Sequence, residues 1–315
     1  MNDNKKTDKI IENMGDGGGQ LVFASYKEGY IFKQYRGIGT AVVLPSQIED
    51  KTVVGVERKA FLSCKTIRSI TLPDTIEEIG DWAFAHMEQL RNITIPCSLP
   101  NRGKELFLGC RRLREIVLNG TEEECAQRAS QGIGRMLALA VTILHDYFLF
   151  DPTNVGKEDW VKRWDEKLLA LLALDDLDGF EELWTCGEED YEGKDYDIKS
   201  YPVEKRKMKL RVVYFRLLHS YKLSDVIKNT LMKYLCRHTK GTDAPEAWEL
   251  IVEEHCSELE YYRIFAEAGG ITEDNFAGIL EDIKDNDAEI KAFLLRYKEE
   301  HFDRKDAFAA FDLVW

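Results

Sequence analysis

The sequence predicts an α+β protein, in which a short β-solenoid with a hairpin cap is followed by an all-α domain of helical hairpins. Three observations support this. A repeat of 23 residues runs through the first half, helical periodicity begins near residue 151, and the charge balance changes near residue 118. We expect a flexible tail over residues 1–19, the solenoid with its caps over residues 20–150, and an α-helical repeat domain over residues 151–315.

The repeat becomes visible when LPDTIEEIGDWAFAHMEQLRNIT (residues 72–94) is aligned with the segments before and after it. Stacked coils place equivalent apolar residues in continuous inward ladders, with one short strand per coil. Proline ends such strands because it has no N–H to donate. The recurring columns are Phe61, Phe84 and Phe107; Ile67, Leu90 and Leu113; Ile70, Ile93 and Ile116; and Pro45, Pro73 and Pro96.

This pattern resembles the BspA-type leucine-rich repeats, whose units follow L-P-x-x-[VI]-x-x-I-G-x-x-A-F-x-x-C-x-x-L-x-x-I-x. The matching residues of one unit are Leu72-Pro73, Ile76, Ile79-Gly80, Ala83-Phe84, Leu90 and Ile93. Met87 stands where the family has cysteine, whereas Cys64 and Cys110 keep it, and the unit over 95–117 departs at Arg102-Gly103. The resemblance covers about a quarter of the chain. It implies a leucine-rich-repeat solenoid with a protein-interaction or surface-adhesion role.

Both ends of the solenoid need caps, because terminal coils would otherwise expose their apolar cores. Upstream, LVFASY (21–26) and YIFKQY (30–35) flank a short Gly-bearing loop and predict a hairpin. Downstream, Thr121 with Glu124 predicts a capping box that starts a short helix. The segment RMLALAVTILHDYFLF (135–150) is expected to close the stack as one or two strands, with a buried helix as the alternative.

Helical periodicity dominates the second half, beginning with Trp160, Trp164 and Leu168 on one face of a helix over about 157–174. CGEEDYEGKDYDIKS (186–200) predicts an exposed acidic loop. Further helices are expected to begin at Pro202, Ser224, Thr242 to Pro245, Ser257, Thr272 and Asp287. The last of these helices is similar to the second helix of an ankyrin repeat, with Glu289-Ile290 and Phe293-Leu294-Leu295 matching its E-I-V-x-x-L-L run.

Charge and cysteine usage narrow the class of partner and the compartment. Residues 1–118 carry a net charge of +2 and residues 119–315 a net charge of −16, which argues against nucleic acid or an anionic membrane surface as a partner of the second half. The seven cysteines form no C-x-x-C pair, and the start of the chain has no apolar signal region. The apolar run over 136–144 is too short to span a bilayer. We therefore expect a cytoplasmic protein without a membrane span.

The sequence contains no recognisable catalytic motif, and we predict neither catalytic residues nor a cofactor. Cys236, His238, His255 and Cys256 have the right number for zinc, but their spacings are poor, so no metal site is predicted. Two alternatives stay open. One is an enzyme with an unrecognised site in the helical domain or at the domain junction, around His145 and Trp160. The other is a surface adhesin whose leader is missing.

We predict a non-enzymatic interaction or scaffold module that binds a protein partner through the outward strand face of the solenoid. Arg68, Arg91 and Arg114 also repeat every 23 residues, which would bring their guanidinium groups together. This column is either a solubilising position, paired with Glu88 or Glu115, or an anion-recognising stripe. The predicted binding residues are Arg68, Ser69, Thr71, Arg91, Asn92, Thr94, Arg114 and Glu115.

Overall fold

The structure is a computed structural model that describes residues 8–179, 199–283 and 288–303. The chain divides into two compact units, Met1–Leu168 and Leu169–Trp315, and the boundary falls within helix α3 (Glu158–Ala173). The fold is α+β, with a β-solenoid of about four turns over residues 30–118 followed by a helical region. Each unit is described below by itself.

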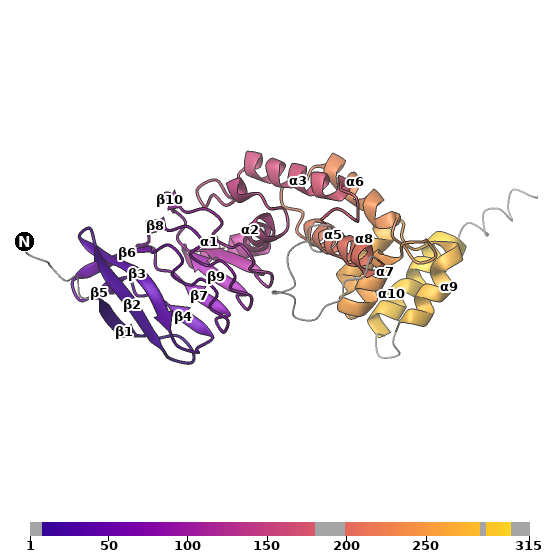
Figure 1. Cartoon of the computed structure of the whole chain (residues 1–315). Coiled ribbons are helices and arrows are strands. Elements are labelled where there is room, and N and C mark those ends of the chain that lie inside the picture. Colours follow the sequence, from indigo (N-terminus) through magenta and orange to yellow (C-terminus); the bar gives the residue numbers. More distant parts are fainter. Residues whose placement is uncertain (1–7, 180–198, 284–287, 304–315) are drawn as a thin grey trace, which may run out of the picture. The chain divides into compact units, whose positions relative to one another are not determined.

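Two sheets build the solenoid in the first unit (Figure 1). One runs in the order β1-β2-β3-β6-β8-β10, with β5 also paired to β6, and the other in the order β11-β9-β7-β4. From β3 to β10, and throughout the second sheet, neighbouring strands on these paths are parallel, as stacked coils require. The strands are β1 (Lys9–Glu12), β2 (Gln20–Tyr26), β3 (Gly29–Arg36), β4 (Ala41–Val43), β5 (Gln47–Ile48), β6 (Lys51–Val56), β7 (Ser69–Thr71), β8 (Glu78–Ile79), β9 (Asn92–Ile95), β10 (Asn101–Arg102) and β11 (Glu115–Leu118).

A ladder of phenylalanine rings forms the centre of this core and confirms the predicted column. Phe61 and Phe84 stack with ring centroids 5.6 Å apart, and Phe84 and Phe107 stack at 5.5 Å. The ladder continues to Phe32, 4.6 Å from Phe61, and ends edge-on against Phe150, 5.4 Å from Phe107. All five rings are buried, so each coil contributes one rung to a continuous apolar wall.

The expected hairpin is present, and the strand before it corrects the expected tail. Strands β2 and β3 pair antiparallel around Lys27 and Glu28, and Lys27 takes a left-handed conformation with φ of 53°. Strand β1, which lies inside the expected tail over residues 1–19, pairs antiparallel with β2. The tail prediction was wrong for these residues, because Lys9–Glu12 alternates between half-buried and exposed side chains and adds a strand to the sheet.

Strand β4 lies at one edge of the second sheet, and the Asn13 side chain covers that edge. Its amide nitrogen donates to the Ala41 carbonyl at 2.8 Å, and its amide oxygen accepts from the Val43 N–H at 3.2 Å. Asn13 is 6% exposed, so one buried side chain satisfies two backbone groups that a further strand would otherwise bind.

Replacing Asn13 with leucine is expected to lower the free energy of unfolding by about 2 kcal/mol, because the backbone groups of Gly15, Gly18, Ala41 and Val43 lose their side-chain partner. Urea denaturation followed by circular dichroism measures the change. Asn13→Asp is the matched variant: it keeps the acceptor for Val43 but loses the donor to Ala41, and should fall between wild type and Asn13→Leu. Equal stability of wild type and Asn13→Leu would contradict the role of this amide.

The other end of the solenoid is closed by helices. Helix α1 (Glu122–Ser130) starts at the predicted capping box of Thr121 and Glu124. The expected strands over residues 135–150 are wrong, because helix α2 (Ile133–Thr142) covers most of that apolar run and the short helix η1 (Tyr147–Leu149) follows. The alternative of a buried helix is confirmed. Alanine and leucine favour a helix, and burial of eight of the ten α2 residues accounts for its apolar character on all sides.

The second unit is helical over its described residues, and most predicted starts are confirmed. Ser224 and Thr272 cap their helices through side-chain hydrogen bonds. The prediction that Ser257 caps the next helix was wrong, since the N-cap of α8 is Glu258. The acidic loop up to residue 198 and the Asp287 cap fall outside the described residues. The elements are α5 (Ser200–Leu218), α6 (Asp225–Cys236), α7 (Glu246–Glu254), α8 (Leu259–Glu267), α9 (Glu273–Asp282), α10 (Ala288–Lys298) and η2 (Glu299–Asp303).

Candidate functional site

The outer face of the second sheet gathers the predicted polar residues in two columns. Register pairs Ser69 with Asn92 and Asn92 with Glu115, while Thr71 pairs with Thr94. The residues between them, such as Ile70 and Ile93, are buried, so alternation turns the polar side chains outward. We call the eight predicted residues on and beside this face, Arg68, Ser69, Thr71, Arg91, Asn92, Thr94, Arg114 and Glu115, the outer strand face.

The three arginines form an exposed column beside the two polar columns. Their backbones are linked, since the Arg91 N–H donates to the Arg68 carbonyl at 2.8 Å and the Arg114 N–H to the Arg91 carbonyl at 2.7 Å. Over the described ranges, their guanidinium groups form no hydrogen bond or ion pair, and neither Glu88 nor Glu115 neutralises them. The column therefore has free donors and unbalanced positive charge.

Sequence reasoning missed further basic side chains in the segments that precede the strands. The three pre-strand segments, residues 65–69, 88–92 and 111–115, hold six basic side chains against two acidic ones. Arg112 contacts the equivalent residue of the preceding coil, with its guanidinium donating to Gln89 Oε1 at 2.7 Å. The additional basic residues are Lys65, Arg111 and Arg112, and the local excess of basic residues in these segments, not a 23-residue column, was the signal that could have found them.

Side chains cover both edges of this sheet. Asn13 covers β4, as described above. At the other end, the Arg135 guanidinium donates to the Arg114 carbonyl at 3.1 Å, and Arg128 donates to the carbonyls of Leu118 and Asn119 at 3.3 and 3.1 Å. With the edge groups satisfied in this way, the sheet is suited to recognition by outward side chains and not by addition of a strand.

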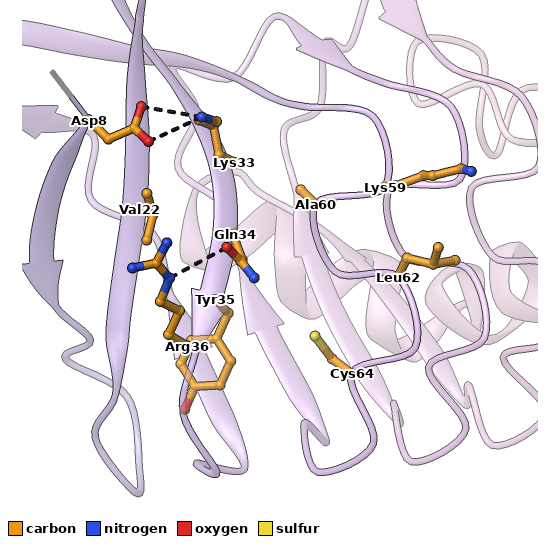
Figure 2. Close-up of a pocket in the computed structure, with 10 residues that line it drawn as sticks. All are labelled: Asp8, Val22, Lys33, Gln34, Tyr35, Arg36, Lys59, Ala60, Leu62 and Cys64. Atoms are coloured by element: carbon orange, nitrogen blue, oxygen red, sulfur yellow. Dashed lines mark hydrogen bonds and ion pairs between the residues drawn. The ribbon is translucent and has the colours of Figure 1, made fainter. Parts of the chain in front are cut away.

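A pocket of about 250 Å³ lies on the first unit, and sequence reasoning did not predict it (Figure 2). Its polar part combines Lys33, which is ion-paired with Asp8 at 3.1 Å, with Arg36 and Lys59. Burial raises the pKa of the Cys64 thiol, which therefore stays protonated and weakly nucleophilic at neutral pH. The other residues that line it are Val22, Gln34, Tyr35, Ala60 and Leu62.

The residues around His145 and Trp160, where an enzyme site was the alternative, have structural contacts. The Trp160 indole N–H donates to the Leu149 carbonyl at 2.8 Å. Asp146 is 4% exposed and pairs with Arg163 at 3.0 Å and Lys167 at 3.3 Å. Burial alone would raise the pKa of Asp146, but its hydrogen bonds and charge interactions with the two bases outweigh burial and lower it. The ionised carboxylate thus anchors η1 to α3.

In the second unit, a buried polar cluster includes one of the four residues considered for zinc. His238 Nδ1 lies 3.6 Å from Glu246 Oε2, and neither buried atom has a hydrogen-bond partner among the described residues. Burial lowers the pKa of His238, with Glu246 opposing and Arg206 reinforcing that shift. His255 is placed elsewhere, with its ring nitrogen 2.8 Å from Glu258 Oε1.

Over residues 8–179, 199–283 and 288–303, no group of three or more histidine, cysteine, aspartate or glutamate side chains is placed to hold a metal ion. None of the helices in those same ranges has the length and apolar character needed to cross a membrane.

The stacked coils and their phenylalanine ladder define a leucine-rich-repeat solenoid. Residues 31–134 match the family model described as BspA type leucine rich repeat region, in six copies. This match supports the family resemblance for the solenoid part of the chain. It does not extend to the helical unit, for which an ankyrin-like assignment has no corresponding match. Among curated proteins, no match to the chain is found.

Several solved structures of leucine-rich-repeat proteins are similar to about a third of the chain. A leucine rich cell surface protein from Faecalibacterium prausnitzii A2-165 is 22% identical, with a TM-score of 0.28, over 35% of this chain and 33% of that one. A leucine-rich repeat protein from Bacteroides ovatus ATCC 8483 is 26% identical, with a TM-score of 0.28, over 36% and 29%. One from Bacteroides capillosus ATCC 29799 is 19% identical, with a TM-score of 0.25, over 35% and 100%. The chain therefore spans about a third of the first two structures.

Proposed function

We propose that this chain is a non-enzymatic interaction or scaffold module, which binds a protein partner through the outer strand face of its solenoid. Leucine-rich-repeat proteins are in general protein-interaction or surface modules, which agrees with the proposal at the level of class. The observation that carries it is the column of Arg68, Arg91 and Arg114, whose exposed guanidinium groups have no partner among the described residues.

The chemistry of this face favours an acidic partner surface. Arginine binds carboxylates through two parallel hydrogen bonds, and three arginines in register provide such donors at regular intervals. The neighbouring Ser69, Asn92 and Thr94 add neutral donors and acceptors that can fix the orientation of a bound partner. Six basic side chains against two acidic ones in the pre-strand segments also favour fast association with a negatively charged surface.

Replacing Arg91 with glutamate is expected to weaken binding to the partner about a hundredfold, because it removes the central donor and introduces a like charge. The melting temperature should stay nearly unchanged, since the side chain is exposed and unpaired among the described residues. A quantitative pull-down from the source organism, followed by affinity measurement with the recovered protein, tests this.

Lys104→Glu is the matched control for that experiment. It makes the same change of charge on an exposed residue, but Lys104 follows β10 and lies outside the second sheet. It should bind like wild type. A partner bound equally well by wild type and Arg91→Glu would contradict the proposed face, and equal losses in both variants would indicate a nonspecific charge effect.

Further parts of the proposal rest on sequence patterns. We place the protein in the cytoplasm because its seven cysteines are scattered and form no C-x-x-C pair. We assign the helical unit to an ankyrin-like array because of the Glu289-Ile290 and Phe293-Leu294-Leu295 run. We also propose a solenoid domain over residues 20–150, to which β1 adds Lys9–Glu12, and a helical domain over residues 151–315. The enzyme alternative gains no support from the contacts of Asp146 and Trp160.

A further inference from the structure

The coil wall that carries the phenylalanine ladder is held together by a regular series of backbone hydrogen bonds. In each step, three N–H groups of one coil donate to three carbonyls of the next coil along the chain. We call the coil that carries Phe61 the first coil and the coil that carries Phe84 the second coil. The bonds from the first coil are Lys59 N to Asp81 O at 3.0 Å, Phe61 N to Ala83 O at 2.8 Å and Ser63 N to Ala85 O at 3.0 Å. The bonds from the second coil are Trp82 N to Lys104 O at 3.0 Å, Phe84 N to Leu106 O at 3.2 Å and His86 N to Leu108 O at 2.6 Å.

The first coil has three carbonyls at the positions equivalent to these acceptors, those of Arg58, Ala60 and Leu62, but within the described chain no donor reaches any of them. Ala60 and Leu62 correspond to Ala83 and Ala85, which accept from the preceding coil. Over the ranges that the structure describes, the carbonyls of Ala60 and Leu62 accept no hydrogen bond. By analogy with the next coil, both point towards strand β3.

Strand β3 stops pairing at the point where it would have to supply the missing donors. It pairs with β6 only through Tyr30, Ile31 and Phe32, and the register shifts after Tyr30. Beyond Phe32, no backbone hydrogen bond joins residues 33–36 to the first coil within the described chain. The edge of β3 over Lys33–Arg36 and the carbonyl edge of the first coil therefore face one another without being bonded.

The pocket of about 250 Å³ lies between these two edges (Figure 2). One side is made by residues 33–36 of β3, and the other by Lys59, Ala60, Leu62 and Cys64 of the coil. Its volume is below the ~300–1,000 Å³ that is usual for pockets of whole small-molecule ligands. It is therefore better suited to a few residues of a longer chain than to a compact metabolite.

We propose that this pocket is a second docking site, which takes a short extended peptide of a partner protein that carries an acidic side chain. The peptide's N–H groups would donate to the carbonyls of Ala60 and Leu62 and supply the missing step of the ladder. Ala60, Leu62 and Val22 provide apolar surface for a small side chain.

Charge decides which peptide fits. Lys33 is balanced by Asp8, but among the described residues neither Arg36 nor Lys59 has an ion pair. The Arg36 guanidinium donates to Gln34 Oε1 at 3.4 Å, and the Lys59 ammonium lies over the Trp82 ring, 5.3 Å from its centroid. Two cations are therefore available to an acidic side chain. The chain's own residues 1–7 contain Lys5 and Lys6, whose charge is of the wrong sign for this rim.

The probe for a test is a fluorescein-labelled Glu-Val-Glu-Val-Glu peptide, with a second peptide that is N-methylated at alternate backbone nitrogens. Fluorescence anisotropy should show binding of the first peptide by the full chain, and binding about tenfold weaker for the second. Arg36→Glu and Lys59→Glu should each weaken the first peptide about tenfold. Hydrogen exchange of the backbone amides over residues 33–36 should slow in the complex.

Lys104→Glu serves as the control for loss of positive charge and should leave binding of the probe unchanged. Arg91→Glu reports whether the probe binds the outer strand face instead, since that face also attracts acids. Loss of binding in Arg91→Glu but not in Arg36→Glu would overturn the pocket as the site, while leaving the proposed function intact.

Equal affinity for the two peptides, no binding of the first, or slowed exchange at Asn92–Ile95 instead of β3 would each overturn the proposal. So would stronger binding after deletion of residues 2–7, or a dimer that Arg36→Glu disrupts, because the pocket would then be filled by this chain itself. Thermal melts confirm that the variants are folded.

Discussion

Replacing Phe84 with alanine is expected to lower the free energy of unfolding of the first unit by about 3–5 kcal/mol. Phe84 is fully buried and lies between Phe61 and Phe107, with ring centroids 5.6 and 5.5 Å away. Its removal loses the transfer free energy of the ring and leaves a cavity that the fixed coil spacing prevents from closing. Urea denaturation followed by circular dichroism and by hydrogen exchange at Phe61 and Phe107 measures the effect.

Two variants make this result specific. Phe84→Leu fills part of the cavity and is expected to be clearly less destabilising than Phe84→Ala. Phe148→Ala removes the same side chain from a residue that is 83% exposed, and its effect should stay within about 0.5 kcal/mol. Similar losses for Phe84→Ala and Phe148→Ala would show that the ladder does not hold the solenoid together.

Replacing Asp176 with alanine should lower the free energy of unfolding of the second unit by about 3 kcal/mol at neutral pH. Lys209 is 1% exposed, and its ammonium group lies 2.7 Å from Asp176 Oδ1 and 2.6 Å from the Leu174 carbonyl. Without the carboxylate, a buried cation keeps only a neutral acceptor. Asp176 also pairs with Arg206 at 3.2 Å, so a second base loses part of its neutralisation.

The loss should depend on pH in a defined direction. Burial alone would raise the pKa of Asp176, but its hydrogen bonds and charge interactions with Lys209 and Arg206 outweigh burial and lower the pKa. A lowered pKa stabilises the fold fully above the ordinary aspartate pKa of about 3.9, and this stabilisation disappears as the pH falls through the lowered value. The gap between wild type and Asp176→Ala should therefore be constant near neutral pH and narrow below about pH 4.

Asp178→Asn is the control for this experiment, since Asp178 is exposed and its carboxylate has no hydrogen bond among the described residues, where its bonds are all made by its backbone N–H and carbonyl. Equilibrium unfolding at a series of pH values compares the three proteins. A gap between wild type and Asp176→Ala that widens in acid would contradict the ion pair with Lys209.

Much of the solenoid could be predicted from the sequence, because its constraint is periodic. Each inward position repeats every 23 residues, so Phe61, Phe84 and Phe107 identify one another without knowledge of the rest of the fold. The same periodicity predicted the outward residues of β7 and β9. Whether those residues bind a partner stays a prediction, since periodicity describes where a side chain lies and not what it meets.

The features that the sequence did not reveal depend on contacts between segments with no common period. The apolar residues over 135–150 are compatible with a strand as well as with a helix. Burial against the last coil favours the helix, α2. The pairing of Asp176 with Lys209 has no mark in the sequence, because the two residues are 33 positions apart. The pocket arises where the pairing of β3 with β6 ends after Phe32, a point that the sequence does not mark.

The missing step of the coil-wall ladder also has a consequence for the order in which the chain can fold. In each complete step, the N–H groups of one coil donate to carbonyls of the next coil along the chain. A coil that is synthesised first can therefore form these bonds only after the following coil has been synthesised and folded. The first coil depends on β3 for only part of its length. The hairpin of β2 and β3 can therefore form locally and early, while the coils assemble on one another after the ribosome has released them.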